Sequence, residues 1–346
     1  KDIPNDFTYA FKADGYVWSD AYQAKESDVV VTGFLNETIN QFYAGLGGSL
    51  DVGTQKDSLY SYNNSILRLN PYLKFQGDNY KIDAGLNLAR EFGFSSRVFI
   101  FPAAKLELQV IPKYIRIFAE VRGDVNKTSL KDLADENPFI EQDINIKNSV
   151  DRLDLSLGLK GMFAPGLGFK ATIFRNSVKN MPMFVSDFTN TFNKFAVIYD
   201  GGNATVTGFN GELDFKQSED LDIFGRVEFR NYQLATEPQA WNLPKFKLTA
   251  GTTIHLTKQL SINGSVLFRG QTYDRTMVTP PGGGSPTNEV VLIDSFADLS
   301  GGAEYKINSR FSIFGQVNNI LNTTNQVWLY YPNYGFNIFG GVGVHF

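Results

Sequence analysis

Apolar and polar residues alternate one by one through much of this chain. In the segment KLELQV, the apolar side chains are Leu106, Leu108 and Val110, and polar side chains fill the positions between them. The segment RLDLSLGLK at residues 152–160 places leucine at every second position in the same way. A period of two residues is typical of a strand with two unlike faces, whereas an amphipathic helix repeats about every 3.6 residues. We therefore predict β-strands in these windows, each with one apolar face and one polar face.

Sixteen segments show this alternation, and fourteen is the alternative count. They lie near residues 7–19, 28–35, 40–53, 65–76, 80–90, 97–110, 114–123, 149–161, 167–175, 195–215, 221–232, 245–256, 260–273, 291–306, 310–320 and 336–346. Tight and long connections strictly alternate between them. GDN after Gln76 and QSED after Phe215 are tight connections rich in turn-forming residues, whereas residues 124–149 and 274–290 are long ones.

Such alternation predicts an up-and-down antiparallel meander with tight turns on one rim and long loops on the other. Bacterial outer-membrane barrels have this layout, with an even strand number, short periplasmic turns and long extracellular loops. A closed barrel also pairs every backbone group, as lipid requires. We therefore predict an all-β fold, a transmembrane up-and-down antiparallel β-barrel that forms a single domain over residues 1–346. The expected location is the outer membrane of a Gram-negative bacterium.

A pair of soluble β-sandwiches is the alternative fold, because no apolar run approaches the roughly 18 residues of a membrane helix. Two features favour the barrel. The polar faces carry charges on nearly every strand, and aromatic residues, 14% of the chain, gather near strand ends as interfacial girdles do, for example at Tyr16–Trp18 and Val327–Tyr331. The net charge of -4 argues against nucleic-acid binding, and the absence of cysteine excludes thiolate sites. We expect no metal and no cofactor.

Charged side chains share the polar parity that would face the barrel lumen. They are Lys105, Glu107, Arg116, Glu120, Arg122, Arg152, Asp154, Lys160, Arg226, Glu228, Arg230, Lys245 and Lys247. In one interpretation they form a polar pore that sorts solutes by charge. In the other they form cross-strand ion pairs that fill the interior and stabilise the sheet. The mixture of both signs favours the ion-pair ladder.

Three stretches carry a family resemblance. They are ILRLNPYLKFQGDNYKIDAGLNLAR at residues 66–90, LPKFKLTAGTTIHLTKQLSINGSVLFRG at residues 243–270, and the phrase VxNILN at Val317–Asn322 with the Tyr-Pro pair and aromatic-ended strand that follow. In these the sequence resembles the barrel of a TonB-dependent receptor, particularly those of Bacteroidota. The resemblance implies that the last strand is read by the barrel-assembly machinery, with Gly341, Val344 and Phe346 at the signal positions. The Phe, Ile and Val parity of that strand is expected to face lipid.

The resemblance also raises the question of a plug. Such receptors enclose an N-terminal plug in a barrel of about 22 strands. The first predicted strand of this chain begins near residue 7, so we expect no plug within residues 1–346.

The remaining chemistry along the chain is sparse. His255 and His345 both fall near tight turns, without the partner set of a catalytic triad, so we expect no enzyme. The acidic loop at residues 124–147 matches no calcium-loop spacing, and we interpret it as a solvated loop with a short helix at SLKDLAD.

The resemblance implies nutrient or solute uptake, or a passive pore. The alternative is a non-transporting structural or accessory subunit of an outer-membrane complex, in secretion or barrel assembly. Aromatic and amide residues at Tyr60–Asn64, Asn231–Trp241 and Asn325–Tyr334 suit glycans and partner proteins equally. The expected partners are outer-membrane lipid, the assembly machinery during biogenesis, and other outer-membrane or periplasmic proteins.

Overall fold

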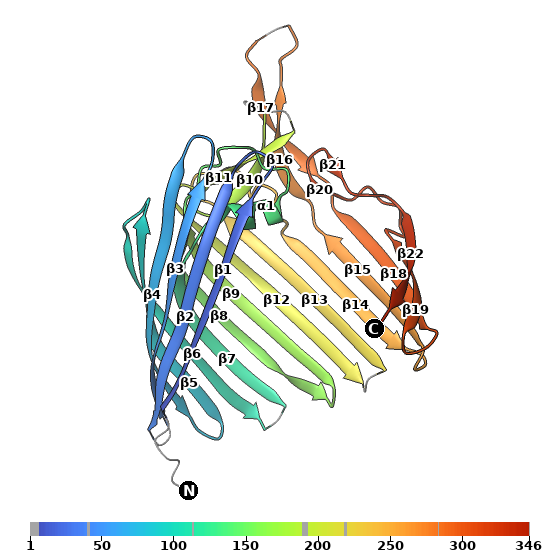
Figure 1. The fold of residues 1–346 in the computed structure, drawn as a ribbon. Helices are drawn as coiled ribbons and strands as arrows, with labels where there is room; N and C mark the ends of the chain where they lie inside the picture. The colour runs from blue at the N-terminus through green and yellow to red at the C-terminus, as the bar shows by residue number, and fades with distance from the viewer. Residues whose placement is uncertain are drawn as a thin grey trace.

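The computed structural model describes residues 7–39, 42–112, 114–188, 193–217, 220–282 and 284–345. Long strands dominate this part of the chain, and one short helix accompanies them (Figure 1). The elements are β1 (Phe7–Ser19), β2 (Lys25–Ile39), β3 (Phe42–Lys56), β4 (Ser61–Gln76), β5 (Tyr80–Gly93), β6 (Val98–Ile111), β7 (Ile115–Asn126), α1 (Leu130–Glu136), β8 (Ser149–Ala164), β9 (Leu167–Lys179), β10 (Pro182–Asp187), β11 (Lys194–Tyr199), β12 (Asn203–Gln217), β13 (Leu221–Gln233), β14 (Phe246–His255), β15 (Leu260–Arg269), β16 (Thr272–Val278), β17 (Thr287–Ile293), β18 (Phe296–Lys306), β19 (Phe311–Asn318), β20 (Gln326–Trp328), β21 (Tyr331–Pro332) and β22 (Asn337–Val344).

Sixteen of these strands form one antiparallel sheet, so the predicted count of sixteen wall strands is confirmed. The order is β1-β2-β3-β4-β5-β6-β7-β8-β9-β12-β13-β14-β15-β18-β19-β22, in which each wall strand pairs with the next one along the chain. Loop lengths follow the predicted alternation from β6 onward, whereas the earlier outer-rim connections, at residues 20–24, 57–60 and 94–97, are as short as tight turns. Among the described residues, no helix is long and apolar enough to cross a membrane.

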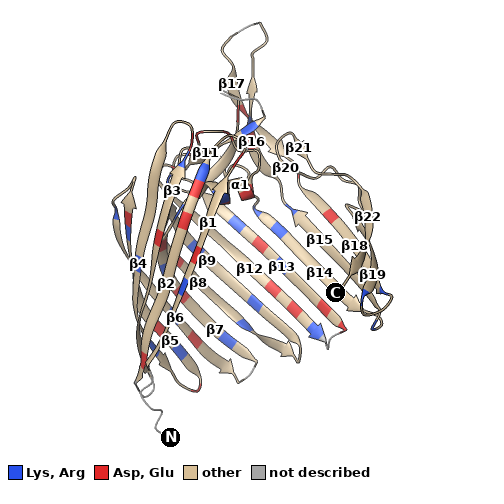
Figure 2. Cartoon of the chain, viewed as in Figure 1, with Lys and Arg blue, Asp and Glu red and all other residues tan. Residues whose placement is uncertain are grey.

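The antiparallel register keeps all residues of one parity on one face of the sheet. Leu157 of β8, for example, lies opposite Ala119 of β7 and Ile173 of β9, so three apolar side chains share one level of the outward face. Leu157 and Ile173 are 49% and 56% exposed. Large apolar side chains in such positions suit contact with lipid. The charged parity occupies the opposite, concave face (Figure 2).

The six remaining strands are hairpins within the long loops, and the prediction missed all three. The hairpin β10–β11 occupies the connection that was predicted as a loop between residues 176 and 194, and β11 was merged with β12. The hairpin β16–β17 rises furthest above the rim (Figure 1), and β20–β21 lies in the last long loop. β10 and β11 carry continuous apolar runs, Met183–Val185 and Phe195–Tyr199, rather than the alternation of wall strands, so a search for alternation did not identify this hairpin.

The two ends of the sheet are formed by β1 and β22, which stand on opposite sides of the opening in Figure 1. Closure of the barrel by pairing of the first and last wall strands was expected. Within the described ranges these two strands are not paired with each other. The described part of the sheet is therefore a strongly curved wall that runs from β1 to β22.

The main hydrophobic core lies in the loops rather than in the wall. It joins residues from the loops after β1, β7, β9 and β19, namely Ala24, Leu130, Leu133, Ile144, Ile146, Phe184, Phe195, Val197 and Trp328. We call this set of packed outer loops the cap. Figure 1 shows α1 and the hairpins β10–β11 and β20–β21 gathered at the same rim.

Candidate functional site

The loop between β7 and β8, residues 127–148, is the central element of the candidate site. It carries α1, which confirms the short helix predicted at SLKDLAD. The side chain of Ser129 caps the helix by accepting a hydrogen bond from the backbone N–H of Asp132 at 3.2 Å. Asp132 also places a carboxylate in the first turn, where the helix dipole favours negative charge.

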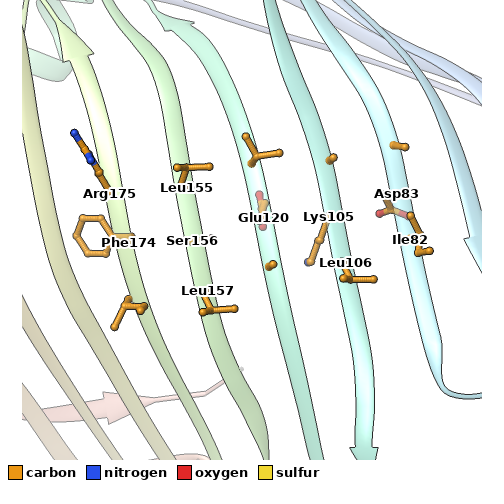
Figure 3. Close-up of a pocket in the computed structure, with 15 residues that line it drawn as sticks. Ile82, Asp83, Lys105, Leu106, Glu120, Leu155, Ser156, Leu157, Phe174 and Arg175 are labelled. Atoms are coloured by element: carbon orange, nitrogen blue, oxygen red, sulfur yellow. The ribbon is translucent and has the colours of Figure 1, made fainter.

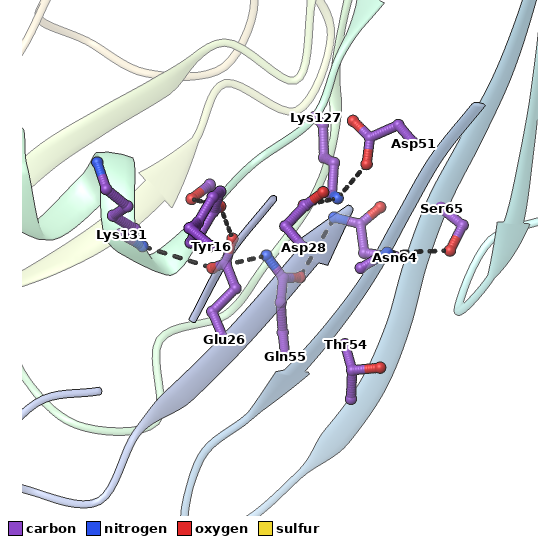
Figure 4. Close-up of polar contacts among 12 residues, drawn as sticks. Tyr16, Glu26, Asp28, Asp51, Thr54, Gln55, Asn64, Ser65, Lys127 and Lys131 are labelled. Atoms are coloured by element: carbon purple, nitrogen blue, oxygen red, sulfur yellow. Dashed lines mark hydrogen bonds and ion pairs between the residues drawn. The ribbon is translucent and has the colours of Figure 1, made fainter. Parts of the chain in front are cut away.

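A buried ion triplet anchors the start of this loop to the inner face of the wall. Lys127 Nζ donates to Asp28 of β2 and, at 2.5 Å, to Asp51 of β3 (Figure 4). The side chains of Lys127, Asp28 and Asp51 are only 8%, 5% and 13% exposed. Removing one partner from such a group leaves uncompensated charge in a region from which water is excluded.

Glu26 of β2 holds the first turn of α1. Its carboxylate accepts hydrogen bonds from the backbone N–H of Leu130 at 2.5 Å and from the hydroxyl of Tyr16 at 2.5 Å. Glu26 is 1% exposed, yet each of these partners satisfies one of its oxygens. A carboxylate at a helix N-terminus satisfies orphan N–H groups and interacts favourably with the dipole. The contact therefore fixes the position of α1 against β1 and β2.

Buried amides tie down both ends of the loop. The carbonyl of Thr128 accepts from Gln55 Nε2 at 2.7 Å and from Asn64 Nδ2 at 3.2 Å. At the other end, Asn148 donates to Asn64 Oδ1 at 2.9 Å and to Glu91 Oε1 at 3.0 Å. Because Gln55, Asn64 and Glu91 belong to β3, β4 and β5, the loop is docked along four neighbouring strands, β2–β5. Alternation of the sequence did not identify these polar positions, although all lie on the lumen-facing parity near the outer ends of strands.

The far end of α1 approaches the opposite part of the wall. Burial raises the pKa of Glu136, while the positive charges of Arg269 on β15 and Lys247 on β14 act to lower it. Glu136 forms no ion pair with either residue within the described part of the chain. Figure 1 shows α1 at the outer mouth of the curved sheet.

The loop also joins the hairpin β10–β11. Ile140 forms a parallel bridge with Phe195 of β11, and the backbone N–H of Glu141 donates to the carbonyl of Phe195 at 2.9 Å. Burial, together with a hydrogen bond and repulsion from Asp187 of β10, raises the pKa of Glu141 to about 8, against an opposing influence of Arg275. Glu141 is therefore largely protonated at neutral pH and can share its proton with the Asp187 carboxylate.

Aromatic residues of the loop between β19 and β22 pack against the rest of the cap. Phe139 stacks on Tyr331 with 3.7 Å between ring centroids, and Trp328 packs edge-on against Phe184 at 5.2 Å and Phe195 at 5.3 Å. The sequence suggested such aromatics as surfaces for a ligand or partner. Trp328 is instead 9% exposed, so the loops use these rings to pack against one another. Tyr334, at 89% exposure, remains available to a ligand.

The structure brings many of the lumen-facing charges together in pairs. Lys160 Nζ lies 2.6 Å from Glu107, which also contacts Lys105 at 3.2 Å. Arg122 pairs with Asp154 at 3.0 Å and approaches Glu120 at 3.9 Å, and Arg230 pairs with Glu228 at 2.9 Å. Figure 2 shows both signs interspersed across the inner face from β6 to β14. A cavity of about 550 Å³ lies between the group formed by Arg122, Asp154 and Glu120 and the strands β12 and β13.

Several residues predicted to face the lumen do not take part in these ion pairs. Arg226 lies over the ring of Phe224, and the charge of Lys247 acts to lower the pKa of Glu136. Arg152 lies at a β-bulge between Asp151 and Leu153. Because a bulge interrupts the alternation, its parity does not assign Arg152 to the lumen. Ion pairs of Arg116 and Lys245 are not found among the described residues.

The two histidines lie at tight-turn ends of their strands. His255 Nδ1 is 2.7 Å from Ser261 Oγ, a partner on the next strand that the sequence did not reveal, and the pair is exposed. His345 donates its backbone N–H to the carbonyl of Arg310. Within the part of the chain that the structure describes, no group of three or more His, Cys, Asp or Glu residues is placed to hold a metal ion.

Two of the three predicted assembly-signal residues are visible. Gly341 lies opposite Phe314, whose ring would meet any added Cβ at 2.8 Å, and Val344 lies opposite Phe311. Phe346 lies outside the described residues. In this register Ile338, Val342 and Val344 share the outward face, as the sequence predicted.

Comparison with known proteins identifies the kind of barrel. Residues 153–320 match the family described as TonB dependent receptor-like, beta-barrel. The ferric enterobactin receptor of Pseudomonas aeruginosa superposes with a TM-score of 0.65 at 14% identity, covering 98% of this chain and 59% of that protein. The pyoverdine outer membrane receptor of the same organism gives 0.65 at 12% identity (99% and 59%), and the FrpB iron transporter of Neisseria meningitidis gives 0.66 at 10% identity (93% and 55%). No curated protein sequence matches the chain.

Residues 153–320 therefore match the TonB-dependent-receptor-like β-barrel family, and the chain has the fold of Gram-negative outer-membrane receptors, as the sequence predicted. It spans somewhat more than half of the length of the solved receptors that it matches. The Bacteroidota type of the resemblance stays a prediction.

Proposed function

We propose that this chain forms the wall and outer gate of a receptor that imports a specific solute across the outer membrane. One observation carries the proposal: the loop of residues 127–148 is docked at the outer mouth by buried contacts with β2–β5. A passive pore requires a mouth open to diffusion. A receptor requires a mouth whose loops can exchange their mutual contacts for contacts with a ligand, because binding shifts an equilibrium only through such differential interactions.

We further propose that the cargo is a metal chelate or another organic ligand rather than a bare metal ion. Solved relatives include receptors for ferric enterobactin and pyoverdine, an iron transporter and a copper transporter. The described residues of this chain bring together no cluster of metal ligands, whereas the rim offers the exposed aromatic side chains Tyr330 and Tyr334. Rings of this kind stack on flat organic ligands and donate hydrogen bonds through their hydroxyls. Uptake of this kind needs no catalytic group, and we propose that the chain is not an enzyme.

Conductance in planar bilayers distinguishes a gated receptor from a passive pore. The purified full-length protein is compared with a variant in which residues 129–146 are replaced by a short Gly/Ser linker. We expect the wild type to remain closed and the loop variant to show discrete conductance steps. Steady, large conductance from the wild-type protein would contradict the proposal. A wild type and a loop variant that both stay closed and co-purify with a stable partner would favour the accessory-subunit role instead.

Binding identifies the ligand class. Ferric catecholate and ferric hydroxamate chelates are titrated into the full-length protein while tryptophan fluorescence is recorded, since Trp328 lies in the cap. We expect one class to change the fluorescence saturably, and Tyr334→Ala to weaken that response. A response to free Fe³⁺ equal to that of the chelates would argue against an organic ligand.

A further inference from the structure

One arginine lies on the lipid-facing side of the sheet. The outward residues of β9 are Phe169, Ala171, Ile173 and then Arg175. The register places Arg175 directly between Leu155 of β8 and Thr207 of β12, both of which share the outward parity. Its guanidinium therefore projects from the face that contacts lipid, away from the charge ladder of the lumen.

The side chain of Arg175 differs from the lumen arginines in its contacts. It is exposed, and neither a hydrogen bond nor an ion pair is formed by its side chain within the described part of the chain. The lumen arginines Arg122 and Arg230 each have a carboxylate partner within about 3 Å by contrast. An arginine facing lipid costs about 2–4 kcal/mol at the bilayer midplane and about 0–1 kcal/mol near the interfaces. The cost of a lipid-facing arginine is therefore small if the residue lies near an interface and its charge is paired with an anion.

The position of Arg175 along the membrane normal places it near the outer membrane–water interface. It lies eight residues above Leu167, the periplasmic end of β9, which corresponds to about 20 Å along the membrane normal for a strand tilted by about 40°. The apolar band of such barrels is about 25 Å tall. Above Arg175, the outward positions become polar at Ser177 and Thr205. A long side chain at this level extends toward the headgroups of the outer leaflet.

Beside Arg175, the outward face is recessed. Ala84 of β5, Ala104 of β6 and Ala119 of β7 replace the large side chains found elsewhere on this face, and Ala84 and Ala104 are direct cross-strand neighbours. The resulting groove has a volume of about 530 Å³. Figure 3 shows Leu155 and Leu157 between the arginine strand and the alanine strands, with Arg175 at the upper edge.

We propose that this groove and Arg175 form a binding site for a phosphate-bearing lipid of the outer leaflet. The apolar groove takes an acyl chain, whose burial is favourable in proportion to the area covered. The guanidinium binds the lipid phosphate through paired, charge-assisted N–H···O contacts, which its planar geometry favours. The size of the groove lies within the range of about 300–1,000 Å³ that is typical of small-molecule sites.

Native mass spectrometry of the full-length protein in a mild detergent tests this site, with purified lipid A as the probe. The variant Arg175→Leu removes the charge, and Ala104→Phe fills the groove. Arg226→Leu is the matched control, because it makes the same change on the lumen face. We expect one lipid A per chain at saturation for the wild type and for Arg226→Leu, an affinity at least tenfold weaker for Arg175→Leu and for Ala104→Phe, and partial recovery with Arg175→Lys.

Equal affinity of Arg175→Leu and the wild type would overturn the proposal. Competition by millimolar inorganic phosphate would also overturn it, because a site for free phosphate would not need the acyl chain. Heat-modifiable migration on gels, which reports an intact barrel, is recorded for every variant. If Ala104→Phe fails this check, Ala119→Leu fills the same groove with a smaller side chain.

Discussion

Substitution of Lys127 by methionine tests whether the loop of residues 127–148 is held in the mouth by its buried ion triplet. The change keeps the length and most of the apolar stem of the side chain but removes its charge. Asp28 and Asp51, at 5% and 13% exposure, are then left facing each other without a cation. Breaking a buried pair in this way costs about 3–5 kcal/mol. At about 1.4 kcal/mol per tenfold change, local opening of the loop becomes roughly two to four orders of magnitude more frequent.

Hydrogen exchange of the loop amides measures that opening. The backbone N–H of Leu130, which donates to Glu26, is a suitable reporter because its protection depends on the docked loop. We expect its exchange to accelerate by about two to four orders of magnitude in Lys127→Met. Lys131→Met is the control, because Lys131 pairs with Asp135 on the exposed side of the same helix, and we expect little change.

A compensated variant separates charge from packing. Adding Asp28→Asn and Asp51→Asn to Lys127→Met removes the two carboxylates that lost their partner. We expect exchange at Leu130 to return to within about tenfold of the wild type, since the penalty comes from uncompensated charge. Unchanged protection in Lys127→Met would refute the reasoning, and so would an equally large effect of Lys131→Met.

Three further predictions concern the wall and the cap. Leu157→Arg is expected to block or strongly reduce membrane insertion, because arginine facing lipid near the midplane costs about 2–4 kcal/mol, whereas Ser156→Arg on the lumen face is milder; equal heat-modifiable migration of both would contradict the assignment of faces. Since the pKa of Glu141 is raised to about 8 from an ordinary value of about 4.3, the stability that its proton gives the cap is complete below about pH 4 and is lost as the pH rises toward 8. Hydrogen exchange of the cap should therefore accelerate across that range in the wild type, whereas Glu141→Gln should show a flatter dependence. Trp328→Ala removes a buried ring and is expected to destabilise the cap by about 3–5 kcal/mol, measurable as faster proteolysis of the loops while the wall strands stay protected.

The wall could be predicted because its physics is local. In a strand, the face of each side chain is set by parity, and lipid on one side with water on the other imposes the alternation seen at Leu153–Leu159. The same rule placed Glu107, Glu120 and Asp154 on the inner face before any contact was known. It makes no assignment at Arg152, where the register shifts at a bulge, and such bulges leave little trace in a hydrophobic pattern.

The cap could not be predicted in the same way, because its contacts join residues far apart in the chain. Lys127 meets Asp28 across 99 positions, and the carbonyl of Thr128 meets Gln55 across 73. The tyrosines and tryptophans of the outer loops are suitable for binding a ligand and for packing against one another. Only the structure assigned Trp328 to packing and left Tyr334 exposed.

The sequence by itself determined the outer-membrane setting, the sixteen wall strands, their order and the two faces of each, since all of these follow from a period of two residues and from the lengths of the connections. Tertiary structure alone decided that the β7–β8 loop lies at the mouth, that β1 and β22 are not paired with each other in the described ranges, and that Arg175, without a partner among the described residues, lies beside a groove on the lipid-facing side. The physical reason is that alternation reports the solvent on each side of a strand. Which charges, rings and edges meet depends on long-range register and packing, and these are fixed only when the whole sheet has formed.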